Sequence, residues 1–216
     1  MHLGGRVASE VSTAKNIGAA GAAVLGAALA AMPSPLLYEW INLDTNGLTA
    51  AGMVPIAAAI GGGNAPHLEE VGVGSNELGA EGARALGAAL ATCPKLKTIN
   101  VDSNQLGDEG VAALAEALAN CPTLQNLRFS RNDIGAAGFE SLAAQVPHWP
   151  QLRRLGVGRN PGPSDALGRA LAAALPSLPH VEVLDLEGSG LGASTRLLLR
   201  AAKGALGRPQ GLYLGS

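Results

Sequence analysis

The residue types that most often carry catalysis or bind metals are few in this sequence, and they lie far apart. They are His2, His67, Cys93, Cys121, His148 and His180. None of the histidines has a carboxylate or cysteine partner at the spacing of a metal-ligand set or a catalytic pair. We therefore expect no catalytic residue and no metal site, and we predict that the protein is not an enzyme.

Three glycine-rich runs could be phosphate-binding loops: GGGN at 61–64, GVGSNELG at 72–79 and EGSGLG at 187–192. A loop that binds phosphate through its backbone has glycines at fixed places, as in G-x-x-x-x-G-K-[ST] or G-x-G-x-x-G. None of the runs has either spacing. The sequence therefore predicts no nucleotide and no other cofactor.

Two of these runs belong to a repeat that occupies the chain. Copies of about a dozen residues, such as LEEVGVGSNELG and LKTINVDSNQLG, begin at Leu68, Leu96, Leu124 and Leu152, a period of 28 residues. No linker separates the copies, so we expect one domain over 1–216. Its parts are an incomplete repeat at 1–37, full repeats at 38–67, 68–95, 96–123, 124–151, 152–180 and 181–208, and the truncated start of another at 209–216.

Each repeat contains two periodicities. Positions 4 and 6, such as Ile99 and Val101, alternate with polar residues as in a short strand with one buried face. The following part spaces Val111, Leu114 and Leu118 along one face of a helix. Parallel strands lie about 4.8 Å apart, whereas packed helices lie about 8–10 Å apart. A stack of these units must therefore curve, with strands on the concave side and helices on the convex side.

Two columns of residues are predicted to be structural. Position 9 holds Asn46, Asn76, Asn104, Asn132 and Asn160, with Ser189 in the last full repeat. An asparagine both donates and accepts hydrogen bonds, so a stacked column can join the backbones of successive turns. Position 26 holds Cys93, Cys121 and Trp149, which we expect to be buried packing residues. Stacking would allow a Cys93–Cys121 disulfide, but an intracellular setting does not favour one.

The pattern L-x-x-L-x-L-x-x-N-x-L-G-x-x-G-x-x-x-L-x-x-x-L over residues 17–214 resembles the ribonuclease-inhibitor-like class of leucine-rich repeats. The resemblance implies an α/β leucine-rich repeat solenoid, a right-handed βα horseshoe with parallel strands on the concave face. Ribonuclease inhibitors, innate immune receptors and activators of the Ran GTPase have such repeats, and most bind a partner through that face. One repeat departs from the pattern with NPGPSDA, so we predict a helix start rebuilt around Pro161 and Pro163.

Positions 3, 5 and 7 of each strand should face the concave surface, flanked by positions 2 and 8. Their charges run acidic, basic, then acidic along the array. The first acids are Glu39, Asp44, Glu69 and Glu70, and the last are Glu182, Asp185 and Glu187. Between them lies a basic strip of Lys97, Arg128, Arg131, Arg153, Arg154 and Arg159. A cationic strip of this kind steers an acidic partner.

Two further features of this face favour binding. Trp40 is a typical interface anchor, unless residues 1–16 cover it. Gly72, Gly74, Gly156 and Gly158 leave shallow places for bulky side chains of a partner. The predicted partner-binding residues are Trp40, Asn42, Asp44, Glu69, Glu70, Lys97, Asn100, Asp102, Arg128, Ser130, Arg131, Arg153, Arg154, Arg159, Asp185 and Glu187.

The uncharged stretch IGAAGAAVLGAALAAMP, residues 17–33, resembles a signal peptide. It also aligns with LGAEGARALGAALATCP at 78–94, and its bulky residues form one stripe. We interpret it as the helix of the incomplete first repeat, whose strand within 1–15 has degenerated or been lost. This interpretation favours a cytoplasmic location. The formal net charge of −2 predicts no nucleic-acid or membrane partner.

The sequence therefore predicts a scaffold that binds an acidic partner protein through its concave face. Two alternatives remain open: a GTPase-activating regulator like the Ran-activating members, or the sensor fragment of a larger receptor. The last 6 residues, GLYLGS, stop at position 8 of a repeat and leave Leu212 and Leu214 at an uncapped edge. An uncapped edge favours either a longer array or self-association through the ends.

Overall fold

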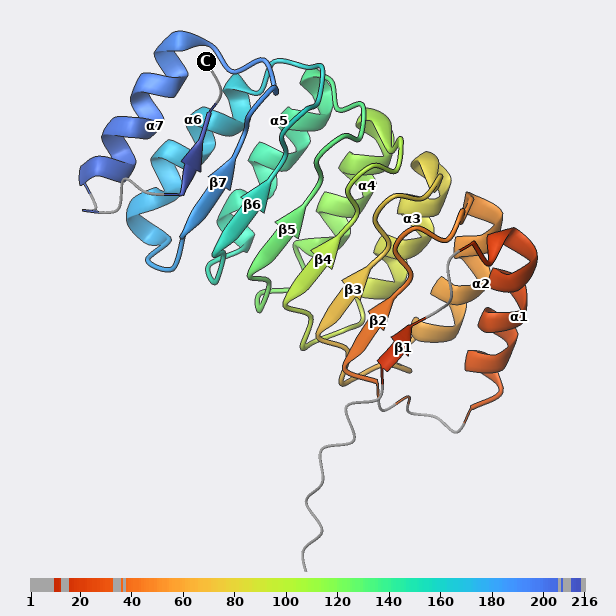
Figure 1. Ribbon diagram of the computed structural model, residues 1–216. Coiled ribbons are helices and arrows are strands. Elements are labelled where there is room, and N and C mark those ends of the chain that lie inside the picture. Colours follow the sequence, from red (N-terminus) through yellow and green to blue (C-terminus); the bar gives the residue numbers. More distant parts are fainter. Residues whose placement is uncertain are drawn as a thin grey trace, which may run out of the picture.

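The computed structural model describes residues 10–12, 16–32, 36, 38–205, 207 and 211–214. Strands and helices alternate along the chain and stack into one arc (Figure 1). The strands are β1 (Glu10–Ser12), β2 (Trp40–Asn42), β3 (Glu70–Gly72), β4 (Thr98–Asn100), β5 (Asn126–Arg128), β6 (Arg154–Gly156), β7 (Val183–Asp185) and β8 (Leu212–Tyr213). The helices are α1 (Gly18–Ala30), α2 (Ala50–Ile60), α3 (Gly79–Leu90), α4 (Gly107–Leu118), α5 (Ala136–Gln145), α6 (Asp165–Ala174) and α7 (Ala193–Ala205), with 3₁₀ turns η1 (Val146–His148) and η2 (Leu175–Ser177).

The strands form one parallel sheet in which sequence order is also spatial order. Residues at the same repeat position lie side by side: Ile41 pairs with Val71, which pairs with Ile99. All the helices lie on the other face of the sheet (Figure 1). This arrangement confirms the predicted α/β leucine-rich repeat solenoid, with strands on the concave side.

The expectation that the first repeat has lost its strand is wrong. β1 pairs with β2, with Val11 opposite Ile41, and α1 follows it as the predicted helix. Strand pairing uses backbone groups that every non-proline residue carries, so a weak side-chain pattern does not prevent it. Residues 1–9 and 13–15, where the rest of that expectation falls, lie outside the described residues.

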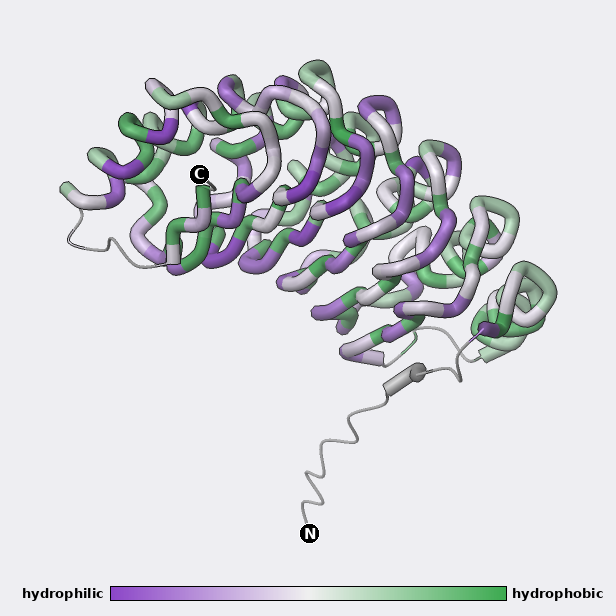
Figure 2. Tube along the Cα trace, turned by 45° about the horizontal axis from the view of Figure 1, so that its top comes forward, coloured by the Kyte–Doolittle hydropathy of each residue, from purple (hydrophilic) through white to green (hydrophobic). Residues whose placement is uncertain are grey.

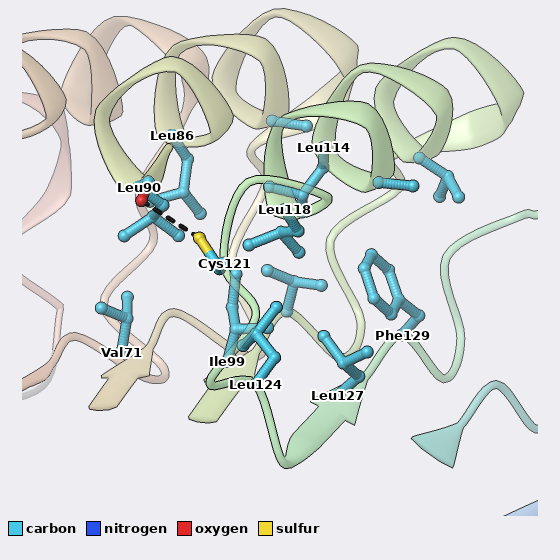
Figure 3. Close-up of a cluster of buried hydrophobic side chains, with 14 of the residues drawn as sticks. Val71, Leu86, Leu90, Ile99, Leu114, Leu118, Cys121, Leu124, Leu127 and Phe129 are labelled. Atoms are coloured by element: carbon cyan, nitrogen blue, oxygen red, sulfur yellow. Dashed lines mark hydrogen bonds between the residues drawn. The ribbon is translucent and has the colours of Figure 1, made fainter. Parts of the chain in front are cut away.

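The core lies between the sheet and the helices. Val71, Ile99 and Leu127 from the strands face Leu86, Leu90, Leu114 and Leu118 from the helices, and all are buried (Figure 3). Fully burying one such side chain stabilises the fold by about 1.5–3 kcal/mol. Because each layer of this core is shared by two repeats, the array holds the concave face as a rigid surface.

The packing role predicted for position 26 is confirmed. Cys93, Cys121 and Trp149 are fully buried. The Cys121 Sγ donates a hydrogen bond to the Leu90 carbonyl at 3.4 Å (Figure 3), and Trp149 Nε1 donates to the equivalent carbonyl one repeat later, that of Leu118, at 3.1 Å. Burial raises the pKa of each cysteine thiol to about 11.

The asparagine ladder at position 9 is also confirmed. Asn76 Oδ1 accepts the backbone N–H groups of Asn46 and Leu48, each at 3.0 Å, while its Nδ2 donates to the carbonyls of Leu43 and Val73. The pattern continues through Asn104, Asn132 and Asn160, all of them buried. The ladder fixes the turn that follows each strand, and so fixes the residues next to it.

The helix start in the 152–180 repeat is rebuilt as predicted. A Cβ on Gly162 would lie 2.4 Å from the Gly135 carbonyl carbon, so this close approach requires glycine. Ser164 precedes α6, and its hydroxyl hydrogen-bonds the hydroxyl of Ser189 at 2.8 Å, which continues the ladder where asparagine is missing. On α6, a hydrogen bond from the Thr195 side chain lowers the pKa of Asp165.

Candidate functional site

A groove of about 490 Å³ crosses the concave face where strands β2 to β7 end. It is lined by Asp44, Thr45, Gly74, Ser75, Asn100, Asp102, Ser103, Arg128, Ser130, Arg131, Gly158, Arg159, Asp185 and Glu187. These residues occupy repeat positions 5, 7 and 8, so the groove follows the carboxyl ends of the strands. We call this side of the concave face the loop end, and positions 2 and 3 the start end.

The backbone at position 8 ends each strand in the same way. Thr45, Ser75, Ser103, Arg131 and Arg159 all have left-handed φ angles, between 55° and 60°. The next residue enters the asparagine ladder, which holds this turn in place. The loops after the strands are largely hydrophilic (Figure 2). The repeat therefore places one polar side chain at the rim of the groove after each of the strands β2 to β6.

The structure divides the predicted partner-binding residues into two groups. Those that line the groove are Asp44, Asn100, Asp102, Arg128, Ser130, Arg131, Arg159, Asp185 and Glu187. Those outside it are Trp40, Asn42, Glu69, Glu70, Lys97, Arg153 and Arg154. Trp40 is 39% exposed and belongs to the start end of β2. The predicted set is thus one surface of the sheet, but it is not one site.

The basic strip is not continuous, because acids on neighbouring strands neutralise part of it. At the start end, Lys97 Nζ lies 2.6 Å from Glu69 Oε2 and Arg153 Nη1 lies 2.9 Å from Glu182 Oε1. Arg154 also approaches Glu182, at 3.6 Å. In the groove, Arg128 Nη2 lies 2.6 Å from Asp102 Oδ2. The simple order of acidic, basic and acidic regions therefore does not describe the charge that remains available.

Arg131 and Arg159 are exposed, and neither side chain forms an ion pair or hydrogen bond with any residue that the structure describes. They occupy the same position on adjacent repeats, with their backbones in register at the loop end. Within the same described part, Asp185 and Glu187 also have no cationic partner. The groove thus contains two guanidinium groups, and at the β7 end two carboxylates, that are not neutralised by the protein; a third carboxylate without a cationic partner among the described residues, Asp44, lies at the β2 end and accepts hydrogen bonds from Gly74 N and Asn100 Nδ2.

The shallow places expected at the glycines are mostly filled. A Cβ on Gly74 would lie 2.8 Å from Asn100 Nδ2, because Asp44 and Asn100 hydrogen-bond to each other across β3. The same Asp44 carboxylate fills the space beside Gly72, and Asp185 Oδ1 lies 3.1 Å from where a Cβ on Gly158 would be. Gly156 alone of the four keeps open space, with Ser130 Oγ nearest, at 3.6 Å.

Three groove residues were missed by the sequence reasoning: Thr45, Ser75 and Ser103. They occupy position 8, the same column as Arg131 and Arg159. Position 8 is predicted to reach the concave surface, but the predicted partner-binding set includes only its charged residues. The column itself was the signal, because residues at one repeat position share one place on the solenoid.

Other kinds of site have little support in the described part of the chain. No three histidine, cysteine or acidic side chains there are grouped as a metal site would need. No helix among those residues is long and apolar enough to span a bilayer. His67 Nδ1 lies 3.1 Å from Lys95 Nζ, an exposed contact between neighbouring repeats.

Comparison with protein families places three segments, 64–87, 92–115 and 120–143, in a family described as Leucine Rich repeat. A search of curated proteins gave no significant match. Among solved structures, one described as "Crystal structure of a TDR receptor" is similar at 15% identity and a TM-score of 0.40. The alignment covers 76% of this chain and 25% of that one, so the chain spans about a quarter of that receptor chain. The matched segments and the parallel sheet backed by helices agree on the fold of the chain, which is a leucine-rich repeat solenoid.

Proposed function

We propose that the protein is an interaction scaffold that binds a partner protein in the concave groove. The observation that carries the proposal is the pair of unneutralised guanidinium groups of Arg131 and Arg159 on adjacent repeats. Both stand on turns fixed by the asparagine ladder. Binding sites that are rigid before the partner arrives lose less conformational entropy on binding.

The partner is proposed to present an acidic side chain to these two arginines. A guanidinium binds a carboxylate through two parallel hydrogen bonds, which gives both affinity and orientation. The cations at the start end already have carboxylate partners, so a second acid there would gain much less. No contact or charge among the described residues favours the GTPase regulator or the receptor fragment over the scaffold.

The test is affinity capture with the charge-reversed groove variant Arg131→Glu/Arg159→Glu. Its matched control is Arg84→Glu/Arg200→Glu, which makes the same change in net charge at exposed positions of α3 and α7. We expect the wild type and the control to retain a partner that the groove variant loses. Circular dichroism checks that all three are folded. Equal capture by the groove variant would contradict the proposal.

A further inference from the structure

Acids and bases on neighbouring strands of the concave face generally pair. Lys97 pairs with Glu69, Arg128 with Asp102, and Arg153 with Glu182. The exception lies at the loop end of β6 and β7, where Arg159 forms no ion pair with Asp185 or Glu187 within the described residues. All three residues line the same groove.

The Asp185 carboxylate is hydrogen-bonded to its own strand rather than to Arg159. Its Oδ1 accepts the backbone N–H of Glu187 at 3.1 Å, which holds the carboxylate against its own strand. The same oxygen lies over Gly158, where no side chain competes for the space. Arg159 and the carboxylates of Asp185 and Glu187 therefore line the same groove without forming an ion pair. We call Arg131 and Arg159 the arginine pair, and Asp185 and Glu187 the acid pair.

We propose that the groove recognises an extended segment carrying one acidic and one basic side chain two residues apart. The acidic side chain binds the arginine pair, and the basic side chain binds the acid pair. This proposal rests on the proposed function, and it adds the cationic half of the ligand. It also explains why the groove is not simply a site for polyanions: the acid pair repels any chain that is anionic along its whole length.

The spacing follows from the sheet. The arginine pair follows β5 and β6 at position 8, whereas the acid pair occupies positions 5 and 7 of the next repeat, with Asp185 as the last residue of β7. Measured across the strands, the two centres are therefore separated by one and a half strand spacings, or about 7 Å. In an extended peptide, residues i and i+2 point to the same side and lie about 6.6 Å apart. Residues i and i+1 point to opposite sides, and residues i and i+4 lie about 13 Å apart. A ligand segment that runs across the strands therefore fits the groove when its acidic and basic residues are two positions apart.

The experiment uses fluorescein-labelled Gly/Ser octapeptides that contain one Glu and one Arg at separations of one, two, three or four, in both orders. Dissociation constants are measured by fluorescence anisotropy and by amide shifts in ¹⁵N spectra of the full chain. We expect the separation of two, in one of the orders, to bind about fivefold more tightly than the other separations and than peptides with Glu alone. Equal constants at all separations, or no detectable binding by any peptide, would overturn the inference.

The variant Asp185→Asn/Glu187→Gln separates this inference from the proposed function. It removes both charges of the acid pair but keeps one oxygen atom, Oδ1, at position 185 that can accept the same backbone N–H group. We expect it to lose the preference for a separation of two and to bind the Glu-only peptide at least as well as the wild type does. Retention of the preference would contradict the inference. If this variant still captures the partner while Arg131→Glu/Arg159→Glu does not, the proposed function stands even where the spacing rule fails.

Discussion

The two ends of the concave strands carry the same residue types but leave them in different electrostatic states. At the start end, position 2 places Lys97 beside Glu69 and Arg153 beside Glu182, and the members of each couple have opposite signs and pair. At the loop end, position 8 holds Arg131 beside Arg159, and the column offers neither a counter-charge. In a parallel stack, residues at the same repeat position lie side by side. The signs of neighbouring charges at that position therefore decide whether a charge is paired within the protein or remains available to a ligand.

The largest effect should come from the ladder that holds the loop end. Asn132 Oδ1 accepts the N–H of Asn104 at 2.9 Å, and its Nδ2 donates to the Val101 carbonyl at 2.9 Å. Asn132→Ala leaves the buried N–H of Asn104 without its acceptor and removes one of the two donors to the Val101 carbonyl, the other being Asn104 Nδ2. We therefore expect a loss of about 3 kcal/mol in the free energy of unfolding. Urea denaturation measures it.

Asn46→Ala is the matched control, because Asn46 Oδ1 has no hydrogen-bond partner among the described residues. We expect it to lose about 1 kcal/mol or less. Equal losses for the two variants would show that the ladder bonds do not determine the stability of the turns.

A smaller effect should follow from releasing paired cations at each end. Asp102→Asn frees Arg128 inside the groove, and Glu182→Gln frees Arg153 and Arg154 outside it. The side chains of Arg128, Arg153, Arg154 and Glu182 are well exposed, and only that of Asp102, at 16%, is largely covered. Each change should therefore alter stability by about 1 kcal/mol or less. Only Asp102→Asn should strengthen binding of the Glu-only peptide, as measured by anisotropy. A stronger gain from Glu182→Gln would mean that the start end also binds ligands.

The effect with the least influence on ligand binding concerns the helical side of the solenoid. The pKa of Cys93 and Cys121 is 9.0 without the fold and is raised to about 11 by burial. A raised pKa gives stability that is complete below pH 9 and is lost as the pH rises through about 11, because the unfolded thiols ionise first. Urea unfolding at pH 8 and pH 10.5 should show this decrease, and Cys93→Ala/Cys121→Ala should reduce it. If the double variant loses as much stability between pH 8 and pH 10.5 as the wild type does, groups other than these thiols cause the loss.

The fold could be predicted from the sequence because every repeat has the same pattern of buried and hydrogen-bonding positions. Ile99 and Val101 are buried, Asn104 bonds its neighbouring turns, and Trp149 fills the same column as Cys121. The site was predictable only to the level of the concave face. Whether Lys97 reaches Glu69, or Asp44 fills the space above Gly74, depends on long side chains from different repeats.

Some of that pairing had a signal in the sequence that was not used. Lys97 and Glu69 share position 2, and residues that share a position lie side by side in a parallel stack. The turn of Asp185 onto Gly158 had no comparable signal, since it depends on one backbone hydrogen bond and on one missing side chain. The identity of the partner and the cytoplasmic location stay predictions.

The most direct test of the central claim compares charge reversal at the two ends, using the partner captured by the wild type. Arg131→Glu/Arg159→Glu removes the unpaired arginines of the loop end, and Arg153→Glu/Arg154→Glu makes the same charge change at the start end. Calorimetry should show about a hundredfold loss of affinity for the first variant and about threefold or less for the second. An equal loss for both variants would contradict the account, because net charge on the concave face would then matter and the position of the unpaired charges would not.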